Sequence, residues 1–279
     1  MKFKKMRAIW AASAVLGTSL IAGNAQTAPA NSSSNPLSQA ERAASLYNRQ
    51  ILSSDNQKIG KVDNVIVDLE SEHILYVVLN DNGNKVAVPP QVLGQSAGNM
   101  LRANAPKSKI DSAPKFTSNM NNAAQLGQAS FVSQVYQAFG ANRWWQGSTP
   151  VDQGTFHNVH KLNQLIGMNV EDVNNATIGK ISNVVVDMPT GRLLYVAFAP
   201  ASKMNLGNNL YAMPSDAFTL SSDQSHLVTN IDQQKLAAAP HFASNSWPNI
   251  NDSTFASQVY QYYGKQAWFN NSAYQPTGR

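Results

Sequence analysis

Short apolar runs alternate with turn-forming residues along two stretches of the chain, one in each half. In the first half the clearest runs are 65–67 and 74–79, and weaker ones follow at 85–88 and 101–104. Short runs that are rich in β-branched residues and bounded by turns are typical of strands. Corresponding runs at 210–213 and 227–230 predict the same strands in the second half. Four or five short strands within about 65 residues predict a small closed barrel, which leaves no strand edge exposed.

A helical pattern follows each strand-rich stretch. Aromatic and aliphatic residues recur there at helical spacing, so they fall on one face of a predicted helix. Each predicted helix ends at a glycine, Gly140 or Gly264, a residue suited to the left-handed conformation of a C-cap. We expect each helix to cover the barrel that precedes it with its apolar face. These faces consist of Phe131, Val135, Tyr136 and Phe139, and of Phe255, Val259, Tyr260 and Tyr263.

The two halves are copies of one unit. Residues 59–69, IGKVDNVIVDL, align with residues 178–188, IGKISNVVVDM, at an offset of 119. The helical strings FVSQVYQ (131–137) and FASQVYQ (255–261) align at an offset of 124. About a quarter of the aligned positions are identical and they keep the same order, which indicates an internal duplication.

The duplication and the polar stretches around it predict the domain boundaries. We expect one repeat at 46–146 and the other at 161–272, with residues 273–279 as a tail. The stretch 147–160 contains glycine and proline and is predicted to be a linker. The stretch 26–45, rich in Ser, Asn and Ala, is predicted to be a flexible leader. The predicted fold class is mainly β with α extensions: two small barrels in tandem, each followed by a short helical segment.

One hairpin loop differs between the repeats. The first repeat has Asp81-Asn82-Gly83-Asn84, a typical tight-turn sequence. The second repeat has a longer loop at 202–209 and carries six extra residues in this region. A loop that varies on a constant scaffold is where we expect specificity to lie.

The repeated strings resemble a known family. Residues 59–79 and their copy at 178–198 are similar to the glycine-to-aspartate core of the PRC-barrel family, named for the H subunit of photosynthetic reaction centres. The continuation at 236–242, Trp247-Pro248-Asn249 and Tyr262-Tyr263-Gly264 resembles exported bacterial members, whereas the first repeat departs from those motifs. The resemblance implies two PRC-type β-barrels that act as interaction modules, and it supplies no catalytic residues.

The N-terminal segment has the pattern of a signal peptide. Lys2, Lys4, Lys5 and Arg7 precede an uncharged, mostly apolar run at 8–22, which is shorter than the roughly 20 residues that span a bilayer. Small residues allow cleavage after Ala25, and Ala30 is a second candidate. We therefore expect residues 1–25 to be removed and the mature chain to be periplasmic or secreted, with no stable membrane anchor.

Removing this segment changes the charge. The precursor carries +5, with 21 basic and 16 acidic residues, but four of the basic residues lie in the signal. The mature chain is then close to neutral, so nothing in its charge predicts binding to nucleic acid or to an anionic membrane. Asn and Gln, 50 in all, take the place of charged residues.

The sequence predicts neither a cofactor nor a metal site. The chain has no cysteine, which excludes thiol catalysis, disulfides and cysteine-based metal sites. His157 and His160 form a His-x-x-His pair, but they lie in the predicted linker, where a third ligand and a rigid scaffold are lacking. His73 aligns with Arg192, which predicts an exposed turn rather than a catalytic base.

Four repeated residues are predicted to shape turns. Asp68 and Asp187 lie where a strand enters a turn, and their carboxylates can accept hydrogen bonds from N–H groups one or two residues on. Gly60 and Gly179 precede these strands and predict a bulge or a close backbone contact. We therefore interpret the two carboxylates as structural rather than catalytic.

The aromatic pairs after the helices allow two interpretations. Trp144-Trp145 and Trp268-Phe269 can fold back as lids on the barrels, because large aromatic side chains are usually partly buried. Alternatively they form a patch that binds a partner.

Three functional hypotheses remain. The first is a non-enzymatic periplasmic protein whose PRC-barrel modules bind an unidentified protein in a structural or envelope-stress role. The second is an electron-transport accessory like the reaction-centre H subunit, which requires contact with a membrane. The third is a hydrolase with an unrecognised site, although the chain has no nucleophile elbow, phosphate loop or dinucleotide fingerprint.

Overall fold

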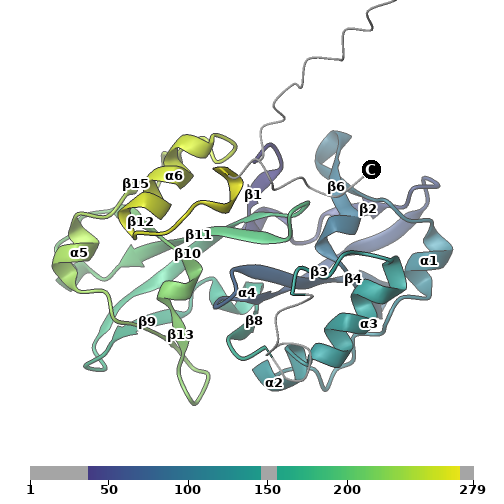
Figure 1. Ribbon diagram of the computed structural model, residues 1–279, viewed down its shortest axis with the longest axis horizontal. Helices are drawn as coiled ribbons and strands as arrows, with labels where there is room; N and C mark the ends of the chain where they lie inside the picture. Colours follow the sequence, from purple (N-terminus) through teal and green to yellow (C-terminus); the bar gives the residue numbers. More distant parts are fainter. Residues whose placement is uncertain (1–36, 146–155, 271–279) are drawn as a thin grey trace, which may run out of the picture. The chain divides into compact units, whose positions relative to one another are not determined.

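Residues 37–145 and 156–270 are described by the structure, a computed structural model, and all of them belong to one unit that begins at Asn35. The predicted signal peptide, most of the predicted leader and linker, and the predicted tail lie outside the described residues. Within them the fold is mainly β with helical extensions, as predicted (Figure 1).

The first repeat contributes seven strands and three α-helices in the described part of the chain. They are β1 (Ala40–Arg42), β2 (Gln50–Leu52), β3 (Lys58–Asp68), β4 (His73–Asp81), β5 (Asn84–Val88), β6 (Leu93–Ser96), β7 (Met100–Ala103), α1 (Lys107–Asp111), α2 (Ala123–Leu126) and α3 (Ala129–Phe139). The strands predicted at 65–67, 74–79, 85–88 and 101–104 correspond to β3, β4, β5 and β7.

The second repeat begins with seven strands in the same order, but it has the helix α4 after the first of them and a further strand, β15, before its last helix. Its elements are β8 (Val159–Lys161), α4 (Leu162–Leu165), β9 (Asn169–Asp172), β10 (Thr177–Asp187), β11 (Arg192–Pro200), β12 (Asn209–Met213), β13 (Thr219–Leu220), β14 (Leu227–Thr229), α5 (Gln233–Ala237), β15 (His241–Ala243) and α6 (Ser253–Tyr262). Helices α3 and α6 are the predicted ones, and each is followed by a glycine with a positive φ, 66° at Gly140 and 70° at Gly264.

The two repeats share one sheet. Ten of its 15 strands follow a path from β13 to β6 in which β10, β11, β4 and β3 lie side by side, and the other five branch from this path. β11 and β4 meet where Arg192 pairs with His73, and two backbone hydrogen bonds, Ile74 to Gly191 and Leu193 to Glu72, join the repeats there. The closed barrels are not formed among the described residues, because this path does not return on itself. Instead, the long strands β3 and β10 each pair with a short strand of the other repeat, β8 and β1 respectively.

Each repeat gives its first strand to the other. β1 pairs with β10, so that Ala40 lies opposite Asp187, and β8 pairs with β3, so that Val159 lies opposite Asp68. Both pairings join positions that correspond in the two repeats, since each member of one pair is 119 residues from its counterpart. The exchange is therefore reciprocal, as in an isologous contact around a twofold axis.

The exchange corrects the expectation for the stretches at 26–45 and 147–160. Leu37, Ala40 and Ala43 are buried, although they fall in the predicted leader. Phe156, Val159 and His160 are buried, although they fall in the predicted linker. These residues are ordered because they pair with, and pack on, the repeat to which they do not belong in sequence.

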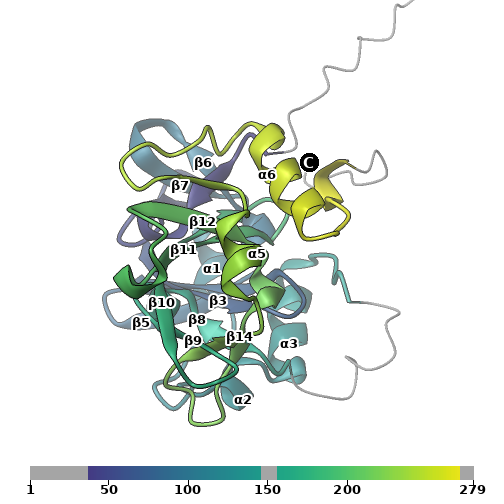
Figure 2. The ribbon, with the colours of Figure 1, turned by 90° about the vertical axis from the view of Figure 1, so that its left-hand side faces the viewer.

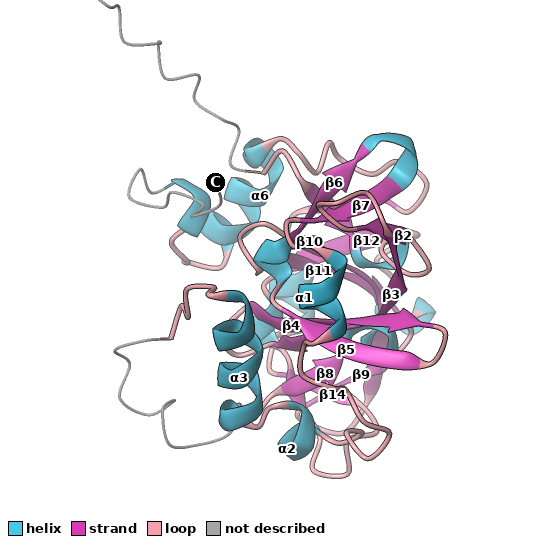
Figure 3. Ribbon diagram, turned by 90° about the vertical axis from the view of Figure 1, so that its right-hand side faces the viewer, coloured by secondary structure: helices cyan, strands magenta, loops and turns pink. Residues whose placement is uncertain are grey.

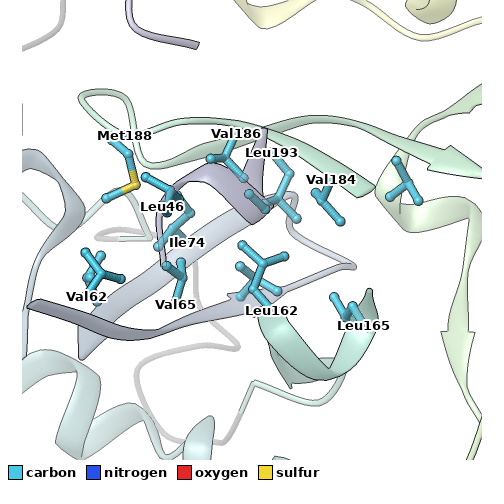
Figure 4. Close-up of a cluster of buried hydrophobic side chains, with 14 of the residues drawn as sticks. Leu46, Val62, Val65, Ile74, Leu162, Leu165, Val184, Val186, Met188 and Leu193 are labelled. Carbon is cyan, nitrogen blue, oxygen red and sulfur yellow. The ribbon is translucent and has the colours of Figure 1, made fainter. Parts of the chain in front are cut away.

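A single apolar core lies between the repeats. It contains Leu46, Val65 and Ile74 from the first repeat together with Leu165 and Leu193 from the second. Figure 4 shows these side chains pointing toward one another across the boundary between the repeats. Because the core is continuous, neither repeat buries its apolar surface alone.

The opposite face of the shared sheet carries the helices. α3 packs against β4 and α6 against β11, and both helices lie on the same side of the sheet (Figures 2 and 3). Each helix has its own apolar cluster, and the exchanged segments complete these clusters crosswise. Leu37 and Ala40 pack with α6, whereas Phe156 and Val159 pack with α3. No helix within 37–145 and 156–270 is long and apolar enough to cross a membrane.

Candidate functional site

The repeated carboxylates are buried in the turns after β3 and β10. Asp68 accepts a hydrogen bond from the backbone N–H of Ser71 at 3.1 Å, and Asp187 accepts one from that of Thr190 at 3.3 Å. The donors lie three residues on, not one or two as the sequence suggested. Burial raises the pKa of Asp187 to about 6, and the nearby Glu41 carboxylate on β1 adds to the increase. With exposures of 3% and 1%, Asp68 and Asp187 are closed to any substrate and hold the turns.

The two repeated glycines allow backbones to approach closely. A Cβ on Gly60 would lie 2.2 Å from the carbonyl oxygen of Asn80, and φ at this residue is +94°. A Cβ on Gly179 would lie 2.3 Å from the carbonyl oxygen of Ala199. Side chains at either position would push neighbouring strands apart, so both glycines have a structural role.

The aromatic pairs act as covers. Trp145, Trp268 and Phe269 are buried, and Trp144 is half-buried. Trp145 packs edge-on against Tyr136 of α3 with ring centroids 4.9 Å apart, and Phe269 packs in the same way against Tyr260 of α6 at 5.5 Å. The residues proposed as a binding patch therefore cover the helices and the sheet, which favours the lid interpretation.

Each aromatic pair also reaches the line where the repeats meet. The His73 ring stacks on Trp144 with centroids 3.6 Å apart, and the Arg192 guanidinium lies over Trp268 at 5.4 Å from the ring centroid. His73 is buried and is not the exposed turn residue expected from the sequence. Burial and the Arg192 charge lower the pKa of His73 well below its ordinary value, so the ring is neutral at physiological pH.

One ionic cluster links the repeats beside this line. The Lys265 ammonium lies 3.1 Å from Glu72 and also pairs with Asp216. The corresponding residues of the other repeat, Ala141, Gly191 and Gln91, carry no charge. The junction is therefore charged on one side only, and its groups are paired with one another.

His160 lies in β8 and is buried, so it does not belong to a solvated linker as predicted; His157 is exposed. The Nε2–H of His160 donates to Oδ1 of Asn158 at 3.2 Å, and Asn158 itself donates to the carbonyl of Phe218. Burial lowers the pKa of His160 to about 4. Among the described residues, no three His, Asp or Glu side chains are grouped so that they could hold a metal ion.

The low pKa of His160 leads to a testable pH effect. The unfolded chain takes up the proton near pH 6.5 but the folded chain only near pH 4, so stability is lost as the pH falls through this window. Between pH 7 and pH 4 we expect the wild-type free energy of unfolding to fall by about 3 kcal/mol relative to that of His160→Gln. Urea unfolding at several pH values measures this difference.

Asp187→Asn is the matched control, because its effect has the opposite sign. The pKa of Asp187 is raised in the folded state, so ionising its carboxyl group destabilises the fold. At low pH the group stays protonated and this cost is absent. As the pH rises from about 4 to 7, Asp187→Asn should gain on the wild type by up to about 3 kcal/mol. Parallel curves for wild type and His160→Gln would show that His160 titrates normally and is not buried as described.

The outer faces of α3 and α6 carry identical polar residues. Gln134 and Gln137 on α3 correspond to Gln258 and Gln261 on α6, and all four are exposed. None of their side chains forms a hydrogen bond with the described residues. In contrast, the identical exposed residues Lys109 and Lys235 have a local cause, because each lies over an aromatic ring of its own repeat, Phe139 or Tyr263. The fold itself does not require these glutamines.

A hollow lies beside the second of these faces. It has a volume of about 560 Å³ and is lined by Gln258 and Gln261 together with Pro240, His241, Phe255 and Tyr262. The sequence contained a signal for this surface, since the string SQVYQ is identical in both helices. Periodicity assigns Val and Tyr of this string to the core and leaves its serine and both glutamines on the solvent side, so this signal, and not the aromatic pairs, indicated the exposed surface.

The fold and the buried repeat residues define a duplicated β-domain whose turn and aromatic residues are structural. The profile of the PRC-barrel domain matches residues 39–109 and 157–232, which together make up more than half of the chain. The protein therefore belongs to the PRC-barrel domain family, as its sequence predicted. The matched segments include β1 and β8, in agreement with the structural limits of the repeats. No curated protein matches the chain.

Proposed function

We propose that this protein is a non-enzymatic binding protein that engages a protein partner through the outer faces of α3 and α6. The observation that carries the proposal is the pair of exposed glutamines that both repeats retain, Gln134 and Gln137 in one and Gln258 and Gln261 in the other. About three quarters of the aligned positions differ, so identity at exposed positions without a structural task indicates a shared role.

The chemistry of the faces indicates the kind of partner. Amide side chains donate and accept hydrogen bonds without carrying charge, which suits the backbone or amides of another protein. The two faces lie on the same side of the sheet (Figure 2). A partner that presents the same feature twice could engage both, and two weak contacts would then combine into a much stronger one.

The proposal that the protein lacks catalytic activity is supported by the state of its titratable groups. Asp68, Asp187 and His73 are buried in turns and beneath an aromatic ring, where no substrate reaches them. The proposal that it acts in the periplasm, or after secretion, is supported by the signal-peptide pattern at 1–25, outside the described residues.

Site-specific crosslinking tests these proposals. Because the chain has no cysteine, Gln134→Cys and Gln258→Cys each introduce a single thiol that can carry a photocrosslinker. We expect both positions to crosslink the same protein in intact cells, with a reagent that does not pass the inner membrane. Reaction with such a reagent also requires that the chain has been exported.

Gln266→Cys is the matched control, because Gln266 is exposed on the second repeat but has no identical counterpart in the first. It should react with the reagent yet crosslink no partner. Crosslinks of equal yield from Gln266→Cys, or different proteins captured by the two helices, would contradict a shared binding face. A loss of all labelling in intact cells would contradict export.

A further inference from the structure

A polar cavity opens on the first repeat, at the start of β3. It has a volume of about 680 Å³, which is within the range of small-molecule sites. The lining side chains come from the chain just before and within β2, from β3, from the β4–β5 hairpin and from α4 of the second repeat. Those used below are Tyr47, Asn48, Gln50, Lys58, Lys61 and Asn163.

The charges around the cavity do not cancel. Its two carboxylates are already paired: Asp63 lies 2.9 Å from the Lys85 ammonium, and Asp81 lies 3.1 Å from that of Lys107, which also pairs with Asp111 at 3.2 Å. Lys58 and Lys61 also line the cavity, but neither forms an ion pair with a residue in the described part of the chain. Lys58 and Lys61 outweigh the one carboxylate left in excess where Lys107 is shared by Asp81 and Asp111, so the cavity has a small positive excess and favours an anion.

The remaining lining groups are hydrogen-bonding and neutral. Asn48, Gln50 and Asn163 contribute amides, and Val62 is the lone aliphatic side chain among the lining residues. The Tyr47 hydroxyl is inaccessible to solvent and has no hydrogen-bond partner among the described residues, and burial raises the pKa of Tyr47, so it stays protonated. This hydroxyl lies behind the wall of the cavity, so the amides are the neutral groups that a ligand can reach.

The second repeat fills the corresponding region. Its longer loop contains a 3-10 helix, Ser202–Met204, whose Met204 is buried in the shared core, and Leu206 packs against the same core. The loop is fixed by hydrogen bonds from Ala201 N–H to the Ile178 carbonyl at 2.7 Å and from the Tyr211 hydroxyl to the Leu206 carbonyl at 3.3 Å. The first repeat has only the tight Asn82-Gly83 turn here. Tyr47 and Lys58 are replaced by Ile166 and Thr177.

We propose that the cavity of the first repeat binds an acidic saccharide, one site per chain, with Lys58 and Lys61 meeting the anionic group. The amides then meet the sugar hydroxyls, which both donate and accept hydrogen bonds. The shared chemistry is a carboxylate or phosphate on a polyhydroxylated ring, as in a uronic acid or a sugar phosphate. This site is separate from the helix faces and does not depend on the function proposed for them.

Titration calorimetry at low salt, with the full mature chain, tests the proposal. The probes are glucuronate, glucose 6-phosphate, glucose and inorganic phosphate. We expect at least one acidic sugar to bind with one equivalent per chain and to bind at least about tenfold more tightly than glucose and than phosphate. The acidic sugar that binds identifies carboxylate or phosphate as the anionic group.

Three variants locate the site. The double variant Lys58→Gln/Lys61→Gln should weaken binding of the acidic sugar by at least about tenfold, whereas Tyr47→Phe, which removes a hydroxyl that solvent does not reach, should not weaken it. Lys180→Gln is the matched control, because Lys180 is the exposed counterpart of Lys61 in the second repeat, and it should bind like the wild type. Unchanged thermal melting shows that the variants are folded.

Three results would contradict the proposed saccharide site. Inorganic phosphate binding as tightly as either sugar would show a simple anion site and overturn the saccharide assignment. Binding of neither acidic sugar at 10 mM, roughly the weak end of specific affinities, would reject the site. Two equivalents per chain, or equal weakening by Lys180→Gln, would show that the cavity of the first repeat is not where the ligand binds.

Discussion

Phe156→Ala is expected to loosen the helix of the first repeat, and Leu37→Ala that of the second. Phe156 precedes β8 at the start of the second repeat, yet it packs against Trp144 and Trp145 beside α3, with ring centroids 5.8 and 5.7 Å away. Leu37 belongs in sequence to the first repeat, yet it is fully buried in the cluster around α6. Truncation should cost about 3–5 kcal/mol at Phe156 and about 2–5 kcal/mol at Leu37.

Native-state hydrogen exchange measures where each loss falls. In Phe156→Ala the amides of α3 should lose more protection than those of α6, and in Leu37→Ala the order should be reversed. Global stability from urea unfolding serves as the reference for both variants. If each substitution affected the helix of its own repeat instead, the strand exchange would be wrong.

Tyr260→Ala is expected to destabilise the whole protein rather than the second repeat alone. Tyr260 lies on α6 and is buried in one cluster with Trp268 and Phe269. Truncating such a ring typically costs about 3–5 kcal/mol. If the repeats had separate cores, the second would melt first. Because both contribute to one continuous core, loss of either should unfold the other, and a single shifted transition is expected in calorimetry.

Tyr136→Ala is the matched change in the first repeat, and it should shift the same single transition by a similar amount. Tyr260→Phe should cost much less than Tyr260→Ala, because the ring and its contacts with Phe269 are kept. Two resolved calorimetric transitions in either alanine variant would show that the repeats fold independently and that the shared core contributes little.

Local patterns in the sequence predicted the parts of the fold that depend on local chemistry. The β-branched runs of β3 and β4 and the aromatic faces of α3 and α6 were all found from their periodicity. The exchange of β1 and β8 was not, because each is a three-residue strand without a periodic pattern of its own. The remaining signal was a single large apolar residue in a polar stretch, Leu37 or Phe156, and periodicity does not reveal which repeat such a residue joins.

The candidate sites show the same limit. Alignment of the repeats placed His73 opposite Arg192, but it could not show that the two residues meet at the junction of the sheet and are covered by tryptophans. Burial of His160 likewise depends on a strand pairing between distant segments. The loop that differs between the repeats is visible in the sequence as a place for specificity, whereas the cavity beside Lys58 and Lys61 depends on how distant segments of the chain pack together.

The reciprocal exchange has a consequence for how such a protein can arise and vary. A polypeptide with one repeat would find the strand it needs only in a second copy, so its folding would depend on concentration. Gene duplication and fusion place both strands on one chain, and the high effective concentration of the linked halves removes that dependence. After fusion the two halves no longer need to have the same sequence. A symmetrical homodimer must change both copies at once, whereas here one half carries the Met204 loop while the other has an open cavity.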